Sequence, residues 1–206
     1  MKYYILAFFF GIICLHFVRE YSKARLCAPP PWVIVGDWTL TNQNNQPFSS
    51  KELAGKVVIA NFFFTRCPSV CPKLTQSMLE VRKRFLKLLD KAAFLGISID
   101  PEFDTPSVLA AYAQKNNLDW PLLTGTKNQV YHVVENQMKF AIGNAHHVAE
   151  LVLFDQQGNV RGKFSTDPTG LASLEKAAKF LIEHPESTQN TQVSAVLKTP
   201  HPLPSF

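Results

Sequence analysis

The sequence predicts an α/β protein, a class in which buried parallel strands alternate with helices. Two continuous apolar runs, "KVVIANFFF" (56–64) and "AAFLGISID" (92–100), have the length and residue types of strands buried on both faces. Between them, apolar residues recur at helical spacing from Leu74 to Leu89. With 206 residues, 46% of them hydrophobic, the chain can form one domain of roughly 150 residues.

The first elements can be justified in chain order. The stretch "DWTLTNQNNQPFSS" (37–50) predicts two short strands around an Asn/Gln turn, ahead of the first buried strand. After the second buried strand, Thr105 is a good N-cap and Pro106 suits the first helical position. A helix is therefore expected from there to about Asn116.

The later elements complete the fold. "WPLLTG" (120–125) predicts a short strand, residues 128–140 a helix, and "HVAELVLFDQQGNVRGKFS" (147–165) a hairpin with its turn at Gln157-Gly158. Residues 168–183 predict a last helix. Together the elements give a thioredoxin-like fold, with a central mixed sheet covered by helices on both faces and an extra N-terminal hairpin.

The N-terminal segment is apolar from Tyr3 to Val18, a length between that of a signal-peptide core and that of a full membrane span. Cleavage signals are weak, and Ile rather than a small residue precedes Cys14, so we expect an uncleaved transmembrane helix or signal segment that anchors the chain. The flanking charges do not set its orientation. The expected organisation is a membrane anchor at 1–25, a Pro-rich linker at 26–35, the folded domain at 36–184 and a disordered tail at 185–206.

Charge gives little information about partners. The net charge is +5, with the basic residues scattered along the chain. One dense group, Arg82, Lys83, Arg84 and Lys87, falls within a predicted helix and is typical of a solvated helix face. No nucleic-acid partner is expected.

Two of the four cysteines, Cys67 and Cys71 in "FFFTRCPSVCP" (62–72), lie in the folded domain, and two thiols are too few for a disulfide framework. They stand where the first buried strand passes into a helix, at the carboxyl end of the sheet, where such folds bind ligands. Free amides at the helix N-terminus, together with Arg66, should lower the pKa of a thiol there. Both sulfurs fall on one helix face if the helix has begun.

The chemistry of this pair has several candidates. Two soft thiolates select Cu(I) or Zn(II), or they oxidise to a disulfide. The spacing differs from the C-x-x-C of general oxidoreductases, and Thr65-Arg66-Cys67 is one residue short of the peroxidatic Thr-x-x-Cys. His146 and His147, just before an apolar strand, offer an imidazole if the loop at 141–145 folds over the sheet. Two thiolates and an imidazole suit three-coordinate Cu(I).

Several stretches, taken in order, resemble the Sco/SenC family of copper-delivery proteins of cytochrome c oxidase assembly. They are "FFFTRCPSVCPKLTQSM", "ISIDPEFDTPSVLAAYA", "WPLLTG" and "HHVAELVLFDQQGNV", which lie within about 36–183. The resemblance implies that Cys67, Cys71 and His147 bind copper, as Cu(I) or Cu(II). The family usually has Asp-His before the late strand, so His146 falls at the Asp position and is the alternative ligand.

Other residues of these stretches have weaker assignments. Asp100, Glu102 and Asp104 of "DPEFDTP" could hydrogen-bond the histidine, shape a partner surface, or serve as caps and turn residues. Met78 and Met138 are expected to fill the core rather than to bind metal.

The resemblance implies a membrane-tethered chaperone that delivers copper to the binuclear copper centre of cytochrome c oxidase subunit II, with other copper carriers or thiol reductants as further partners. The alternative is an enzyme, a thiol:disulfide reductase that uses Cys67 and Cys71 as a redox pair to keep a partner's copper-ligand cysteines reduced. A redox or copper sensor would need an output domain, and none is evident. The expected location is the bacterial inner membrane with the body in the periplasm, or the mitochondrial inner membrane with the body in the intermembrane space.

Overall fold

The structure is a computed structural model that describes residues 35–142 and 150–185. The predicted membrane anchor, nearly all of the linker and the tail beyond residue 185 lie outside the described residues, as do both candidate histidines. Within the described ranges, no helix is both long and apolar enough to cross a membrane.

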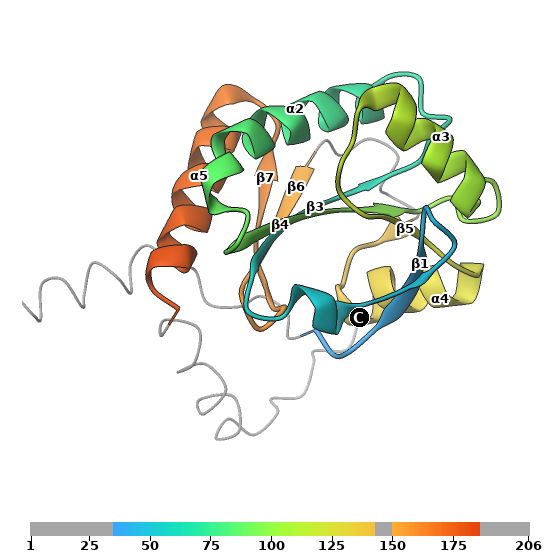
Figure 1. The fold of residues 1–206 in the computed structure, drawn as a ribbon, viewed down its shortest axis with the longest axis horizontal. Helices are drawn as coiled ribbons and strands as arrows, with labels where there is room; N and C mark the ends of the chain where they lie inside the picture. The colour runs from blue at the N-terminus through green and yellow to red at the C-terminus, as the bar shows by residue number, and fades with distance from the viewer. Residues whose placement is uncertain (1–34, 143–149, 186–206) are drawn as a thin grey trace, which may run out of the picture.

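The described part of the chain forms one seven-stranded mixed sheet, with strand order β2-β1-β5-β4-β3-β6-β7 (Figure 1). The three central strands β3, β4 and β5 are parallel, and the other pairings are antiparallel. The strands are β1 (Thr39–Asn42), β2 (Pro47–Ser49), β3 (Val57–Phe63), β4 (Ala92–Ser98), β5 (Leu122–Thr124), β6 (Glu150–Phe154) and β7 (Val160–Ser165). The predicted α/β class and the extra N-terminal hairpin are confirmed.

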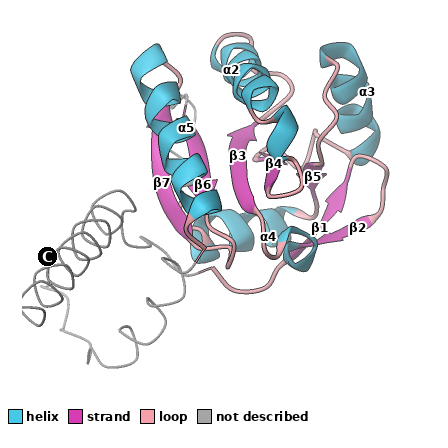
Figure 2. Cartoon of the chain, turned by 60° about the vertical axis from the view of Figure 1, so that its left-hand side comes forward, coloured by secondary structure: helices cyan, strands magenta, loops and turns pink. Residues whose placement is uncertain are grey.

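Helices cover both faces of this sheet, as predicted. Figure 2 shows α5, α2 and α3 side by side on one face and α4 on the other. The helical elements are η1 (Ser50–Leu53), α2 (Val70–Arg84), η2 (Leu86–Leu88), α3 (Pro106–Asn116), α4 (Lys127–Tyr131), the π-helix η3 (His132–Gln137) and α5 (Pro168–Glu183). The chain therefore has a three-layer arrangement with the sheet in the middle.

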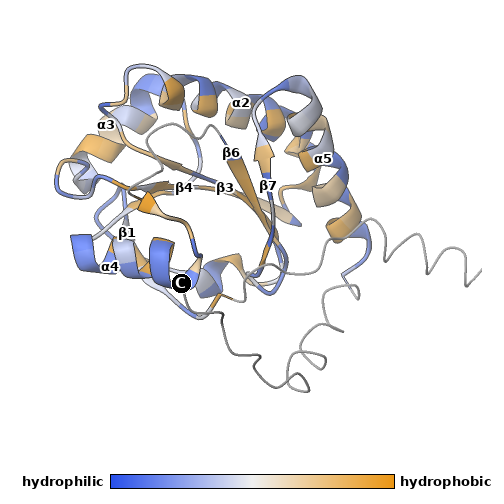
Figure 3. Cartoon of the chain, turned by 180° about the vertical axis from the view of Figure 1, so that it is seen from behind, coloured by the Kyte–Doolittle hydropathy of each residue, from blue (hydrophilic) through white to orange (hydrophobic). Residues whose placement is uncertain are grey.

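The central strand β3 shows why its sequence is apolar at all but one position. Val57, Ile59 and Phe63 belong to the core under α2, α3 and α5, whereas Val58 and Ala60 belong to the core under α4. Both sets are buried, as is Asn61, the one polar residue of the strand, whose side-chain oxygen has no hydrogen-bond partner among the described residues. Figure 3 shows the same pattern, with hydrophobic colour along the central strands and a hydrophilic outer side on α4.

Two helices differ from the prediction. The helix expected over 74–89 begins earlier, at Val70, and ends at Arg84, because Phe85 (φ −102°, ψ 6°) leaves the helical conformation and its N–H bonds to Arg82 O, three residues back. The tighter helix η2 follows. The helix expected over 128–140 is a short α4 that widens into a π-helix, where the N–H of Met138 bonds five residues back, to Val133 O.

Candidate metal and thiol site

Cys67 lies in the turn between β3 and α2, at the carboxyl edge of the parallel strands, as the sequence predicted. Its own N–H donates to Phe64 O, and its sulfur accepts a hydrogen bond from the backbone N–H of Cys71, with Sγ and N 3.4 Å apart. Within the described structure, the Ser69 hydroxyl, at the N-cap position, makes no capping bond to α2. The sulfur of Cys67 therefore takes the acceptor role that a capping side chain usually fills.

This arrangement favours a thiolate at Cys67. Burial alone would raise the pKa of the thiol, since only 8% of the residue is exposed. Hydrogen bonds from the backbone of Cys71, Ser69 and Val70, and from the Cys71 thiol, outweigh burial and lower the pKa from 9.0 to about 7. At neutral pH a large share of Cys67 is thus in the form that binds metal and attacks disulfides.

Cys71 has the opposite character. It sits in the first turn of α2, is 6% exposed and belongs to the core beneath the helix. Burial raises its pKa to about 12, and the nearby Cys67 thiolate and Asp104 carboxylate add to the increase. Without a metal, the pair therefore consists of one cysteine that favours the thiolate form, Cys67, and one that stays protonated at neutral pH, Cys71.

A buried carboxylate holds the turn that carries Cys67. Asp104 is fully buried and accepts hydrogen bonds from the Thr65 N–H (3.0 Å), the Thr65 hydroxyl (2.5 Å) and the Ser98 hydroxyl (2.6 Å). These bonds tie the turn after β3 to the end of β4. Asp104 is not the cap of α3, because Thr105 fills that position by accepting from the N–H of Val108.

The neighbouring charged residues form a second connection. Arg66 pairs with Asp100 at 2.7 Å, and its guanidinium lies 4.2 Å from the centre of the Phe103 ring. The charge expected to act on the thiolate is thus already balanced by Asp100, and backbone amides supply the stabilisation instead. Glu102 pairs with Lys127.

The structure places two of the three predicted ligand residues. It brings Cys67 and Cys71 together, while His146 and His147 lie outside the described residues. Among the residues that are described, no group of three or more His, Cys, Asp or Glu side chains could hold a metal ion. Met78 and Met138 are buried in the two cores, as expected.

Three polar residues near the cysteines were not predicted from the sequence. Thr65 and Ser98 anchor Asp104 through their hydroxyl groups. The hydroxyl of Tyr112 hydrogen-bonds that of Thr75 at 3.0 Å, and Thr75 lies one helical turn after Cys71. Burial raises the pKa of Tyr112, and both thiols contribute. The sequence offered one signal for these residues, namely that they lie in or near the stretches that contain the cysteines and "DPEFDTP". Their spacing in the sequence, however, did not indicate which residue would hydrogen-bond which.

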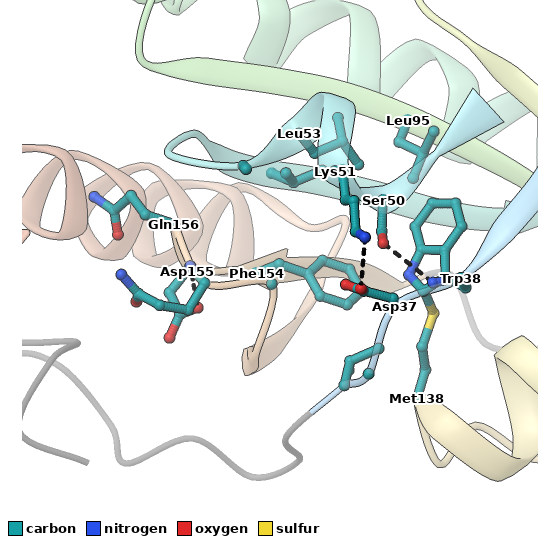
Figure 4. A pocket seen from close by; sticks show the side chains of 16 residues that line it. Asp37, Trp38, Ser50, Lys51, Leu53, Leu95, Met138, Phe154, Asp155 and Gln156 are labelled. Carbon is teal, nitrogen blue, oxygen red and sulfur yellow. Dashed lines mark hydrogen bonds and ion pairs between the residues drawn. The ribbon is translucent and has the colours of Figure 1, made fainter. Parts of the chain in front are cut away.

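A hollow of about 160 Å³ lies at the other end of β3, far from the thiols (Figure 4). Val58 and Phe154, which pair where β3 begins, line it together with Trp38 and Met138. At its edge Lys51 reaches Asp37, with Nζ and Oδ2 3.2 Å apart. Its lining is mainly apolar, and neither cysteine belongs to it.

A thioredoxin-like sheet that presents two thiols where a strand meets a helix defines a class of proteins that bind soft metals or exchange disulfides at that position. Comparison with known proteins narrows this class. The family model described as SCO1/SenC matches residues 29–181. The chain belongs to the SCO1/SenC family.

Individual relatives agree with this assignment. A SCO1/SenC family lipoprotein from Bacillus anthracis is 31% identical, with a TM-score of 0.64 over 73% of this chain and 96% of that one. ScoI of Bradyrhizobium japonicum with copper bound is 26% identical, with a TM-score of 0.60 over 72% and 99%. BsSco, studied for a disulfide switch and described as a member of the Sco family of cytochrome c oxidase assembly proteins, is 25% identical, with a TM-score of 0.61 over 73% and 96%.

Curated relatives match over a shorter stretch. The SCO2-like protein of Rickettsia felis is 35% identical over 102 residues, which is 50% of each chain. The matched region is therefore about half the length of that relative.

Proposed function

We propose that this chain binds copper through Cys67 and Cys71, with His147 as the third ligand, and delivers it during cytochrome c oxidase assembly. The observation that carries the proposal is the sulfur pair at the start of α2, where the Cys71 N–H reaches the Cys67 sulfur. Copper is here the cargo. Two thiolates match the preference of Cu(I) for soft ligands, and a site at a surface turn lets a partner's ligands enter.

The descriptions of two solved relatives support this proposal. One solved relative holds copper, and another is described as a cytochrome c oxidase assembly protein. The acceptor we propose is the binuclear copper centre of cytochrome c oxidase subunit II.

We also propose that residues 1–25 tether the protein to the membrane, with the body in the periplasm or the mitochondrial intermembrane space. A reporter fused after residue 206 should be active only outside the cytoplasm, and cytoplasmic activity would overturn that location.

The test is a Cu(I) titration of the full chain against a competing chelator. One tight site per chain is expected, and Cys67→Ser or Cys71→Ser should abolish it. Cys27→Ser, which changes a cysteine outside the folded domain, is the matched control and should leave the affinity unchanged. If His146→Ala weakens binding and His147→Ala does not, the assignment of the third ligand is wrong.

One observation also favours thiol:disulfide exchange, namely the contrast between a pKa of about 7 at Cys67 and about 12 at Cys71. The Cys67 thiolate would attack a partner disulfide and release one partner thiolate. Cys71, giving up its proton, would then attack the mixed disulfide, leaving a Cys67–Cys71 disulfide and a fully reduced partner. Stopped-flow reduction of an oxidised subunit II domain should then be stoichiometric with the chain, and Cys71→Ser should stop at the mixed disulfide. Absence of any reaction would exclude this activity.

A further inference from the structure

Among the described residues, two large hydrophobic side chains are strongly exposed, Leu86 at 58% and Phe103 at 42%. They lie at opposite ends of the parallel strands. Leu86 is in η2, just before β4 begins, whereas Phe103 is in the loop after β4 ends, at the edge where Cys67 lies. A single exposed apolar residue is ordinary in itself. Phe103 differs from Leu86 in that a cation contacts its ring and in that it lies at the same edge of the sheet as Cys67.

The ring of Phe103 is contacted by a cation on one face, and its backbone is held by hydrogen bonds. Arg66, the residue before Cys67, lies over the ring at 4.2 Å and is itself held by Asp100 at 2.7 Å. The backbone on either side is also bonded, since the N–H of Phe103 donates to Asp100 O and its carbonyl accepts from the N–H of Thr105. A rigid aromatic side chain loses little conformational entropy when a partner packs on it, which is what makes such residues strong binding contacts.

The surroundings of this ring resemble a small interface. Pro68, Ser69 and Pro72, which flank the two cysteines, are exposed, so the surface next to Cys67 is largely uncharged. The charges at this edge are the ion pairs of Arg66 with Asp100 and of Glu102 with Lys127, and the exposed Lys73, which follows Pro72. An apolar centre with a polar edge is the usual composition of a specific protein contact. The ring of Phe103 supplies the apolar centre here, and the charged groups supply the edge.

We propose that Phe103, held beneath Arg66, is the anchor contact for a cysteine-bearing polypeptide that docks beside Cys67 and presents an apolar side chain to the open part of the ring. This inference rests on the proposed function and names the surface through which it works. In the transfer step, Cu(I) leaves the thiolates of this chain as the thiolates of the partner bind it. The partner's thiols lose their protons as they bind copper, and the thiolates of this chain take up protons as they release it. The oxidation state of copper does not change.

The test compares Phe103→Ala with Leu86→Ala, which removes an exposed side chain of similar kind at the other end of the strands. Each full-length variant is loaded with Cu(I) and mixed with the soluble copper-centre domain of subunit II or, separately, with glutathione. For Phe103→Ala, the concentration of domain that gives half-maximal transfer should rise about tenfold. Transfer to glutathione, Cu(I) affinity and alkylation of Cys67 by iodoacetamide should stay as in the unchanged chain. Leu86→Ala should match the unchanged chain in every measurement.

Direct binding of the copper-free domain, measured by surface plasmon resonance, provides a readout that does not depend on copper. Weaker binding of Phe103→Ala, with partial recovery in Phe103→Leu, supports the anchor role. Equal binding of Phe103→Ala and Leu86→Ala, or no binding by the unchanged chain, overturns it. Failure of the proposed function would be seen in a different measurement, the Cu(I) titration, as the absence of a Cu(I) site that depends on Cys67 and Cys71.

Discussion

At the scale of single residues, Cys67 and Cys71 differ in chemistry although they are four positions apart. The sulfur of Cys67 receives amide hydrogen bonds at the start of α2, whereas Cys71 is packed in the core behind it. In the reduced, copper-free chain, iodoacetamide should alkylate Cys67 with a half-maximal rate near pH 7, while Cys71 stays largely unmodified up to about pH 9. Peptide mapping by mass spectrometry separates the sites. Equal rates at neutral pH would contradict the assignment.

The same contrast sets the pH dependence of stability. Because the pKa of Cys67 is lower in the folded than in the unfolded chain, its contribution grows as pH rises from about 7 to 9 and is lost as pH falls back through 7. The pKa of Cys71 is raised, so its effect has the opposite sign and lowers stability above about pH 9. Urea unfolding of the copper-free chain should show the rise, and Cys67→Ser should remove it.

The carboxylate of Asp104 should matter for stability as well as for the site. Asp104→Ala leaves the buried Ser98 hydroxyl and the Thr65 N–H without their acceptor and should cost about 3 kcal/mol of unfolding free energy. Glu102→Ala, which removes a carboxylate from an exposed ion pair in the same loop, is the matched control and should cost less than about 0.5 kcal/mol. Denaturant melts of both variants decide the matter. A loss for Asp104→Ala no larger than the control's would show that the buried bonds do not hold the turn.

Residue-level prediction from sequence succeeded where the motif itself carried the chemistry. Cys67 and Cys71 could be placed at the strand-to-helix junction because the apolar run ends just before them. The bonds to Asp104 could not be predicted, since Thr65 and Asp104 are 39 positions apart and meet only when β3 and β4 pair side by side. The expectation that Arg66 acts on the thiolate was wrong for the same reason. Its partner Asp100 is distant in sequence, so the ion pair that balances its charge could not be foreseen.

At the scale of elements, the buried strands β3 and β4 were predictable because burial on both faces leaves runs that are apolar at nearly every position, with Asn61 and Ser98 as polar exceptions. The ends of α3 and α5 were predicted correctly, whereas those of α2 and α4 were not. The start of α2 depends on the sulfur of Cys67 as an acceptor, and the π-helix after α4 depends on a hydrogen bond five residues back. Neither feature changes the spacing of apolar residues, which is the signal that sequence analysis uses.

The hairpin of β6 and β7, which follows the candidate histidines in sequence, depends on a buried ion pair. Arg161 and Asp155 are both at least 98% buried, as their exposures are 2% and 1%, and are 3.3 Å apart. Burial lowers the pKa of Arg161, and Asp155 opposes that effect. Asp155 also accepts the N–H groups of Gln157 and Asn159 in the turn.

Breaking this pair should therefore cost far more than removing a surface ion pair. Arg161→Met leaves the Asp155 carboxylate buried without its cation, and we expect a loss of about 3–5 kcal/mol. The double variant Asp155→Asn, Arg161→Met should recover part of the loss, because the uncompensated charge is gone while the turn amides keep an acceptor. Arg84→Met, at an exposed pair with Glu175, is the control. Equal melting temperatures for Arg161→Met and Arg84→Met would contradict this account of the hairpin.

At the scale of the whole molecule, the strand order places the cysteine pair and the hollow of Figure 4 at opposite ends of β3. Val35, where the described chain begins, lines that hollow, so the described chain begins at the end of the sheet away from the thiols. The topology was predictable from the order of strands and helices. The proposed third ligand, His147, cannot be compared with the structure, since it lies outside the described residues.

The measurement that tests the central claim most directly is X-ray absorption spectroscopy of the full chain loaded with one equivalent of Cu(I). The account predicts a three-coordinate copper with two sulfur ligands and one nitrogen ligand, and a loss of one sulfur in Cys67→Ser and in Cys71→Ser. His147→Ala should remove the nitrogen contribution alone. A copper environment with no sulfur, or one that neither cysteine substitution changes, would contradict the claim that this pair is a copper site.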